Sequence, residues 1–144
     1  MKRAAAYWRQ KKYLVLSASR TTDGLWILGK PCFAISDASS DIELERAIWT
    51  ALEASQIGIS HPRNWDELPD PLLDLAGVKK WSAFSKGASC LHIKEEGGRI
   101  VLIPTRNLGP AEGFEDDISR QIILESSARE TLGASVRRLL TQKP

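Results

Sequence analysis

The strongest structural signal in the sequence is a β-hairpin in its second half. Residues 89–94 alternate between apolar and polar side chains, and residues 99–103 return as an apolar run. Gly97-Gly98 lies between the two segments, and adjacent glycines suit the tight turns that join antiparallel strands. We expect Pro104 to end the second strand, because proline has no backbone donor. The sequence therefore predicts an antiparallel sheet.

Other short strands are expected on both sides of this hairpin. Residues 13–17 predict a first strand, and Asp23-Gly24 predicts a turn into a second strand at residues 25–28. We expect Pro31 to break the run, so that residues 32–35 form a separate third strand. Residues 121–125 predict another strand. Hairpins are thus the repeating unit of the predicted sheet.

Two amphipathic helices are predicted, each preceded by a capping box. Ser40 and Glu43 have the spacing that satisfies free amides at a helix start, and an apolar stripe follows toward Gly58. Residues 127–130 repeat this signal before a C-terminal helix. The intervening residues 59–81 are expected to be irregular, apart from a short helix between Pro71 and Gly77.

These elements predict the fold class. We expect one α+β domain over residues 1–144, with antiparallel hairpins packed against two or three amphipathic helices. A chain of 144 residues with 42% apolar content is long enough to bury a core without metal or disulfide support. The longest apolar stretches are far shorter than the ~20 residues of a membrane span, and no secretion signal is recognisable. A cytoplasmic protein without membrane contact is expected.

The sequence offers few candidates for catalysis. His61 and His92 could form an acid and base pair. His61, however, precedes Pro62 in an irregular stretch, and the alternation of residues 91–93 places His92 on the polar face of a hairpin. Residues 115–117 are three consecutive acids without the spacing of a calcium loop. Cys32 and Cys90 have no partner at metal-ligand spacing and are expected to be buried free thiols. We therefore predict no catalytic residues, no cofactor and no metal, with a histidine-dependent nuclease as one rival interpretation.

Charge and tryptophan placement indicate a binding surface. The net charge is +2, yet residues 1–12 are basic, and acids gather in three later runs, the last of them at residues 112–117. Trp26 and Trp49 lie in apolar patterns typical of a core, whereas Trp65 and Trp81 lie beside charged residues, as interface anchors do. A nucleic-acid-binding module that uses the basic N-terminal arm and exposed tryptophans is the second rival interpretation.

A group of motifs resembles a known family. The motifs run from Trp81 and Phe84 through residues 85–93, then residues 98–104, and then an Asn-Leu-Gly-Pro loop ahead of Gly113-Phe114. In this order they resemble the immunity proteins of bacterial contact-dependent growth inhibition (CDI) systems. Tyr7-Trp8-Arg9 and the closing Leu132-Gly133-Ala134 helix fit the same family, so the resemblance covers nearly the whole chain.

The resemblance implies a function that the residues alone do not. It implies a non-enzymatic cytoplasmic protein that binds and neutralises the cognate toxin, the C-terminal domain of a CDI effector. Such a toxin is often an RNase or tRNase whose active site the immunity protein covers. We expect a monomer, with a homodimer through hairpin edges as the alternative, and no direct nucleic-acid contact. The expected toxin-binding residues are Trp65, Asp66, Glu67, Asp70, Trp81, Glu112, Glu115, Asp116 and Asp117.

Overall fold

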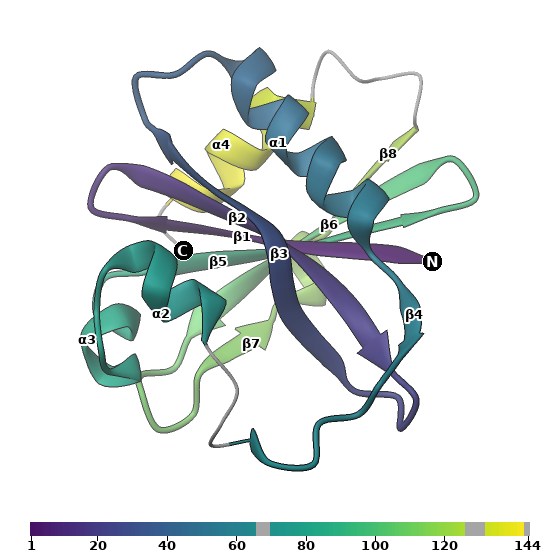
Figure 1. Ribbon diagram of the computed structural model, residues 1–144. Coiled ribbons are helices and arrows are strands. Elements are labelled where there is room, and N and C mark those ends of the chain that lie inside the picture. Colours follow the sequence, from purple (N-terminus) through teal and green to yellow (C-terminus); the bar gives the residue numbers. More distant parts are fainter. Residues whose placement is uncertain (66–69, 126–131, 143–144) are drawn as a thin grey trace.

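A twisted eight-stranded sheet runs through the middle of the computed structural model, which describes residues 1–65, 70–125 and 132–142 (Figure 1). The main strand order is β3-β2-β1-β5-β6-β7; β4 pairs with β2, and β8 pairs with β6. All pairings are antiparallel except β2 with β4. The strands are β1 (Lys2–Arg9), β2 (Lys12–Thr21), β3 (Trp26–Ser36), β4 (Ile57–Ile59), β5 (Ser89–Glu96), β6 (Arg99–Asn107), β7 (Phe114–Asp116) and β8 (Ile122–Glu125).

The N-terminal residues form β1, a central strand that was not predicted. They are therefore not the basic arm that the nucleic-acid-binding interpretation assumed. β1 lies between β2 and β5, so that Ala5 pairs with Leu16 on one side and His92 on the other. Ala4 and Ala6 are fully buried. Alanine has a low β-propensity, which explains why the sequence pattern missed this strand. Its small side chain nevertheless lets α1 and α4 pack closely against the middle of the sheet.

Both prolines that were expected to end strands lie inside them. Pro31 sits where the β2–β3 register shifts, because Leu16 pairs with Cys32 and the next residue pairs with Gly29. β3 is also the outermost strand, where a missing donor is tolerated. The carbonyl of Pro104 accepts a hydrogen bond from the Asp117 amide, so its ring faces the gap between β8 and β7. At both positions, therefore, no neighbouring strand requires the backbone N–H that proline lacks, and the strand continues through the proline.

The predicted turns and the first helix are confirmed. Gly97 and Gly98 both have positive φ at the β5–β6 turn. Ser40 caps α1 (Asp41–Ala54) by accepting a hydrogen bond from the Glu43 amide at 3.2 Å. The helix ends at Ala54, earlier than expected, because Ser55 turns away and donates its hydroxyl to the Ala18 carbonyl at 2.5 Å. β4 follows in place of a further helical turn.

One face of the sheet is covered by α1 and α4 (Leu132–Thr141). Both helices lie over the same side of the sheet (Figure 1). The buried stripe of α1 joins the apolar side of α4 in one core cluster, as the helical spacing predicted. The capping box expected at residues 127–130 lies outside the described residues. The two tryptophans predicted to be core residues are both partly buried. Trp49 packs against this cluster, and Trp26 lies under the Arg3 guanidinium, whose carbon is 5.6 Å from the ring centroid.

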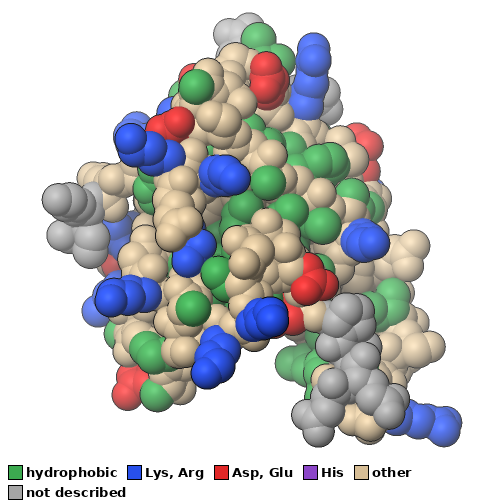
Figure 2. All heavy atoms as spheres, turned by 60° about the vertical axis from the view of Figure 1, so that its left-hand side comes forward, with side chains coloured by type: hydrophobic (Ala, Val, Ile, Leu, Met, Phe, Trp, Pro, Cys, Tyr) green, Lys and Arg blue, Asp and Glu red, His purple; other side chains and the backbone are tan. Residues whose placement is uncertain are grey.

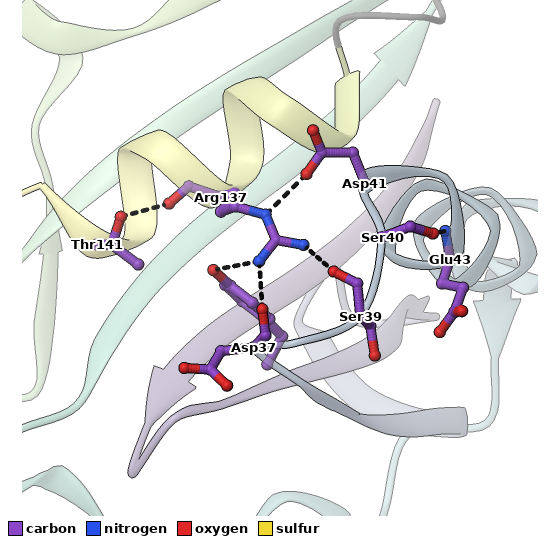
Figure 3. Close-up of polar contacts among 8 residues, drawn as sticks. Asp37, Ser39, Ser40, Asp41, Glu43, Arg137 and Thr141 are labelled. Carbon is purple, nitrogen blue, oxygen red and sulfur yellow. Dashed lines mark hydrogen bonds and ion pairs between the residues drawn. The ribbon is translucent and has the colours of Figure 1, made fainter.

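Arg137 ties α4 to the start of α1 (Figure 3). Its Nε donates to Asp41 Oδ1 at 2.7 Å, and its two terminal nitrogens donate to the carbonyls of Asp37 at 2.8 Å and Ser39 at 2.6 Å. The helices approach so closely here that a Cβ at Gly133 would lie 2.2 Å from the Asp41 carbonyl oxygen. Glycine therefore allows this close approach, because a side chain at this position would force the two backbones apart.

The opposite face is covered by shorter elements, α2 (Pro71–Ala76) and α3 (Trp81–Ser85). α2 begins at Pro71 and stops before Gly77, as predicted, and Gly77 is its left-handed C-cap. α3 was not predicted. Buried Phe84 and Leu72 join side chains of β1, β2 and β5 in a second cluster. The predicted α+β fold is confirmed, with helices on both faces of an antiparallel sheet. The described residues include no helix long and apolar enough to span a membrane.

Candidate functional site

The candidate site is built around residues 107–117, which we call the acidic loop. Asn107 fixes its start, because the side-chain amide donates to the carbonyls of Ser85 at 2.6 Å and Ala88 at 3.0 Å. The same side chain accepts from the Gly109 amide at 2.9 Å. Gly109 and Gly113 have positive φ, and their peptide groups close the loop on itself. The loop is therefore held in one conformation by its own backbone and by the turn after α3.

The acidic loop packs on an aromatic cluster of Tyr7, Trp81, Phe84 and Phe114. Trp81 donates its indole N–H to the Pro110 carbonyl at 3.1 Å and stacks on Phe84 with ring centroids 5.5 Å apart. Phe114 meets Trp81 and Tyr7 edge to face, with centroids 5.9 Å apart in both pairs. The indole N–H of Trp81 is thus bonded within the protein and its ring is half-buried, and the predicted interface role of this residue stays a prediction. Its role in the structure is to position the loop.

Asp116 and Asp117 are likewise engaged within the protein. Asp116 Oδ1 lies 2.6 Å from His92 Nδ1, in a pair that joins β7 to β5. Burial lowers the pKa of His92, and the Asp116 carboxylate opposes that effect in part. Asp117 accepts from the Ser119 hydroxyl at 2.5 Å and from Arg120 Nε at 2.8 Å. These hydrogen bonds lower the pKa of Asp117 and keep its carboxylate charged.

Glu112 and Glu115 differ from these two acids. Both side chains are exposed, and neither forms an ion pair or side-chain hydrogen bond with any other residue that the structure describes. Glu115 lies opposite Arg106 in the short β6–β7 ladder, without a contact between the two charges. Of the four predicted acids in this loop, these two are free to meet a partner.

Trp65 lies in a separate region, beside the outer strand β3. Its side chain is 47% exposed and lines a groove of about 610 Å³ together with Ile27, Leu28, Lys30, Asp70 and Asp74. The His61 ring holds it edge to face, with centroids 5.4 Å apart. The predicted exposure of Trp65 is thus confirmed, and its interface role stays a prediction.

The remaining predicted site residues have structural roles or lie outside the described ranges. Asp70 caps α2 by accepting from the amides of Leu72 at 3.0 Å and Leu73 at 3.1 Å. Sequence reasoning missed this role, although an aspartate immediately before Pro71 is a recognisable capping signal. Asp66 and Glu67 lie outside the described residues.

The two histidines occupy different environments. His61 Nδ1 lies 2.9 Å from the Thr21 hydroxyl, and its Nε2 lies 3.7 Å from Asp23 at the β2–β3 turn. His92 pairs with Asp116 in the middle of the sheet. Burial raises the pKa of the Cys90 thiol to about 12, which leaves it a poor nucleophile, whereas Cys32 is only partly buried. Among the described residues, no group of three His, Cys, Asp or Glu side chains could hold a metal ion.

The surface around these regions carries both signs of charge. Figure 2 shows the side that lies on the left of Figure 1, where α2 and α3 cover the sheet. Hydrophobic side chains gather near the centre of this face, Lys and Arg side chains surround them, and a smaller number of Asp and Glu side chains lie between (Figure 2). An apolar area with a charged rim has the composition of a protein interface.

The comparisons with known proteins agree with this architecture. A solved structure of a protein of unknown function from Neisseria meningitidis, NMB0488, is similar with a TM-score of 0.77 and 15% sequence identity over 97% of this chain and 93% of that chain. A chain of the CdiA-CT/CdiI toxin and immunity complex from Yersinia pseudotuberculosis is similar with a TM-score of 0.75 and 18% identity, over 96% of this chain and 94% of that chain. No curated protein matches.

The sequence itself matches a family model as well. The model describes CdiI, the CDI immunity protein, and it matches residues 2–142, which include both sheet faces, the acidic loop and the Trp65 groove. The match and the fold therefore identify this chain as a member of the CDI immunity protein family.

Proposed function

We propose that this protein is a cytoplasmic immunity protein that binds the toxin domain of a CDI effector and neutralises it without catalysing a reaction. The observation that carries the proposal is the family match over residues 2–142. The similar chain from Yersinia pseudotuberculosis belongs to a toxin and immunity complex, which supports the same interpretation. In this proposal one monomer binds one toxin domain and acts as a stoichiometric inhibitor.

We further propose that the toxin is a nuclease, of the RNase or tRNase type, and that the acidic loop covers its active site. A nuclease cleft is cationic because it binds phosphates, so exposed carboxylates are complementary to it. Glu112 and Glu115 provide such carboxylates, and the Asn107 and Trp81 hydrogen bonds hold them on a fixed backbone. A fixed loop loses little conformational entropy on binding, which favours affinity.

The predicted contact residues divide into two groups under this proposal. Trp65, Glu112 and Glu115 would touch the toxin directly, and Asp66 and Glu67 stay in the contact set as expected from the sequence. Trp81, Asp116 and Asp117 would act indirectly, because their polar groups already bond within the protein. Asp70 caps α2 through Oδ1 alone, so its Oδ2 stays available to the toxin. Substitution of Trp81, Asp116 or Asp117 should alter toxin binding only through the position of the acidic loop.

The first experiment is a binding and inhibition assay with the toxin domain encoded immediately upstream of this chain. Tagged immunity protein should capture the toxin domain, and an equimolar amount should abolish cleavage of total RNA. Failure to bind would contradict the proposed function. Binding without loss of RNA cleavage would contradict neutralisation, and retention of RNA by this protein alone that weakens with salt would favour a nucleic-acid-binding module.

The acidic loop is tested by the double variant Glu112→Gln and Glu115→Gln, which removes two charges and keeps the side-chain shapes. We expect the toxin affinity to fall about 5- to 50-fold, with most of the loss in the association rate at low salt. Glu53→Gln is the matched control, because Glu53 is an exposed carboxylate on α1, over the other face of the sheet. An unchanged affinity in the double variant would reject the proposed role of the acidic loop.

A further inference from the structure

We infer that the groove beside Trp65 receives a cationic side chain, an arginine or lysine, from a loop of the toxin. This inference rests on the proposed function and names a second contact that the acidic loop does not provide. The groove lies between the outer strand β3, the indole of Trp65 and the first turn of α2. Its walls combine an aromatic face, aliphatic side chains and carboxylates, which together suit a long alkyl stem with a positive end.

The apolar part of the groove suits the stem of such a side chain. Ile27 and Leu28 of β3 lie on one side, and Trp65 and Pro71 lie on the other. β3 is the last strand in the main path of the sheet, so no further described strand covers its outer edge. Arginine and lysine bury their methylene groups along apolar walls of this kind and keep the charge at the polar end.

The carboxylates of α2 provide the complementary charge. Asp74 is exposed and makes no ion pair with any described residue. Asp70 uses Oδ1 to cap the helix, which leaves Oδ2 without a bond among the described residues. Lys30 is the one cation among the described residues that line the groove, so the groove keeps a net negative charge. A cation over the indole face is attracted further by the ring quadrupole.

Trp65 is also held in place before any partner binds. The His61 ring packs against it edge to face, and His61 itself is anchored to Thr21 and to the turn at Asp23. This anchor joins the residues before Trp65 to the β2–β3 hairpin. A tryptophan whose position is already fixed gives more binding energy than a mobile one, because less side-chain entropy is lost on association.

The test measures the affinity of the upstream-encoded toxin domain for three variants of the full chain. Trp65→Ala should lose about 10- to 100-fold in affinity, as expected for an interface tryptophan. Trp65→Phe should recover part of that loss, because an aromatic face remains. The double variant Asp70→Asn and Asp74→Asn should lose about tenfold, since asparagine still caps α2 while both charges are gone. Ile42→Ala, at an exposed apolar residue of α1, is the control and should bind as the original protein does.

Double-mutant cycles then identify the toxin side chain. Each arginine and lysine of the toxin domain is changed to alanine and measured against Asp74→Asn. One position should couple with Asp74 by about threefold or more, whereas distant positions should be additive. Coupling at one cation would support the inference, and additivity at every cation would overturn it.

The remaining outcomes separate the inference from the proposed function. Wild-type binding and inhibition with unchanged affinity in all three groove variants would overturn the inference and leave the proposed function intact. Absence of toxin binding by the wild-type protein would overturn both. A wild-type homodimer that Trp65→Ala dissociates, or RNA retention that Trp65→Ala abolishes, would assign the groove to a second copy or to RNA and would overturn the toxin contact.

Discussion

The two faces of the sheet are built differently. α1 and α4 have 14 and 10 residues and bury apolar stripes. Arg137 of α4 donates hydrogen bonds to Asp41 of α1 and to the carbonyls of Asp37 and Ser39 just before it (Figure 3). α2 and α3 have only 6 and 5 residues, so that face is completed by the half-buried aromatic residues Trp81 and Phe114 and by the acidic loop.

This difference separates stability from recognition. On the face under α1 and α4, the apolar stripes of both helices are buried in the core, and the Arg137–Asp41 ion pair joins the two helices. On the face under α2 and α3, Trp65 is exposed beside the His61 ring, and Glu112 and Glu115 are exposed on the acidic loop, which its own backbone hydrogen bonds hold. Substitutions on the first face should therefore change unfolding, and substitutions on the second should also change toxin binding.

The largest expected effect is from Phe84→Ala. Phe84 is fully buried and contacts Tyr7 and Trp81, each with ring centroids 5.5 Å apart. We expect the free energy of unfolding to fall by about 3–5 kcal/mol. Toxin affinity should fall as well, because the acidic loop rests on the same aromatic cluster. Urea denaturation and a binding titration measure the two effects.

Leu52→Ala is the counterpart of that variant on the other face. Leu52 is also fully buried, so the free energy of unfolding should fall by about 2–5 kcal/mol. The folded fraction should bind toxin with unchanged affinity. If Leu52→Ala weakened binding as much as Phe84→Ala, the division between the two faces would be wrong.

Arg137→Met should destabilise the α1–α4 face without removing a buried apolar side chain, although the contact of Arg137 with the Tyr13 ring is also lost. The methionine keeps much of the stem, but the hydrogen bonds to Asp41 and to the carbonyls of Asp37 and Ser39 are lost. We expect a loss of about 2–3 kcal/mol in the free energy of unfolding, because charge-assisted bonds are replaced by solvent. Arg138→Met on the same helix is the control. Equal stability of the two variants would show that the network contributes little.

Gly133→Ala should destabilise the protein less than Arg137→Met does. Its effect comes from an added methyl group and not from lost hydrogen bonds. A Cβ would lie 2.2 Å from the Asp41 carbonyl oxygen, so α4 must move away from α1. Overpacking costs about 1–3 kcal/mol, and the better helix propensity of alanine returns about 1 kcal/mol. We expect a net loss of about 1–2 kcal/mol in thermal or urea unfolding. A stabilised variant would mean that the helices have room to separate.

The smallest expected effect is a pH dependence from His92. Burial lowers its folded pKa below the ordinary value of about 6.5, so the unfolded chain binds protons more readily near that pH. Stability is therefore full above pH 6.5 and falls as the pH drops below it toward the folded pKa. His92→Gln should flatten this slope between pH 7.5 and 5 in urea unfolding experiments.

Asp117→Asn is the control for that experiment. The folded pKa of Asp117 is lowered by its bonds to Ser119 and Arg120, so the stability it contributes is present above its ordinary value of 3.8 and is lost only at more acidic pH. The Asn variant should therefore leave the slope between pH 7.5 and 5 unchanged. A slope that persists in His92→Gln would assign the pH dependence to other groups.

Much of the fold could be predicted from the sequence because its signals are local. The Ser40 cap, the α1 stripe, the Pro71–Gly77 helix and the Gly97-Gly98 hairpin each depend on residues a few positions apart. β1 could not be predicted in this way, since three alanines form a strand only where neighbouring strands and helices enclose them. The continuation of β3 and β6 through their prolines likewise depends on which strand lies alongside.

The candidate site depends even more than the fold on contacts between residues that are far apart in the sequence. Sequence alone determined that the chain carries an acidic run, two tryptophans among charges and the motifs of the CDI immunity family. Only the tertiary structure decided which of those side chains remain available to a partner. The Asp116 carboxylate pairs with His92, which is 24 residues away in the sequence. The Trp81 indole donates a hydrogen bond to the Pro110 carbonyl, which is 29 residues away. Availability depends on such distant partners, because a hydrogen bond forms between groups that folding brings together and not between groups that the sequence places side by side.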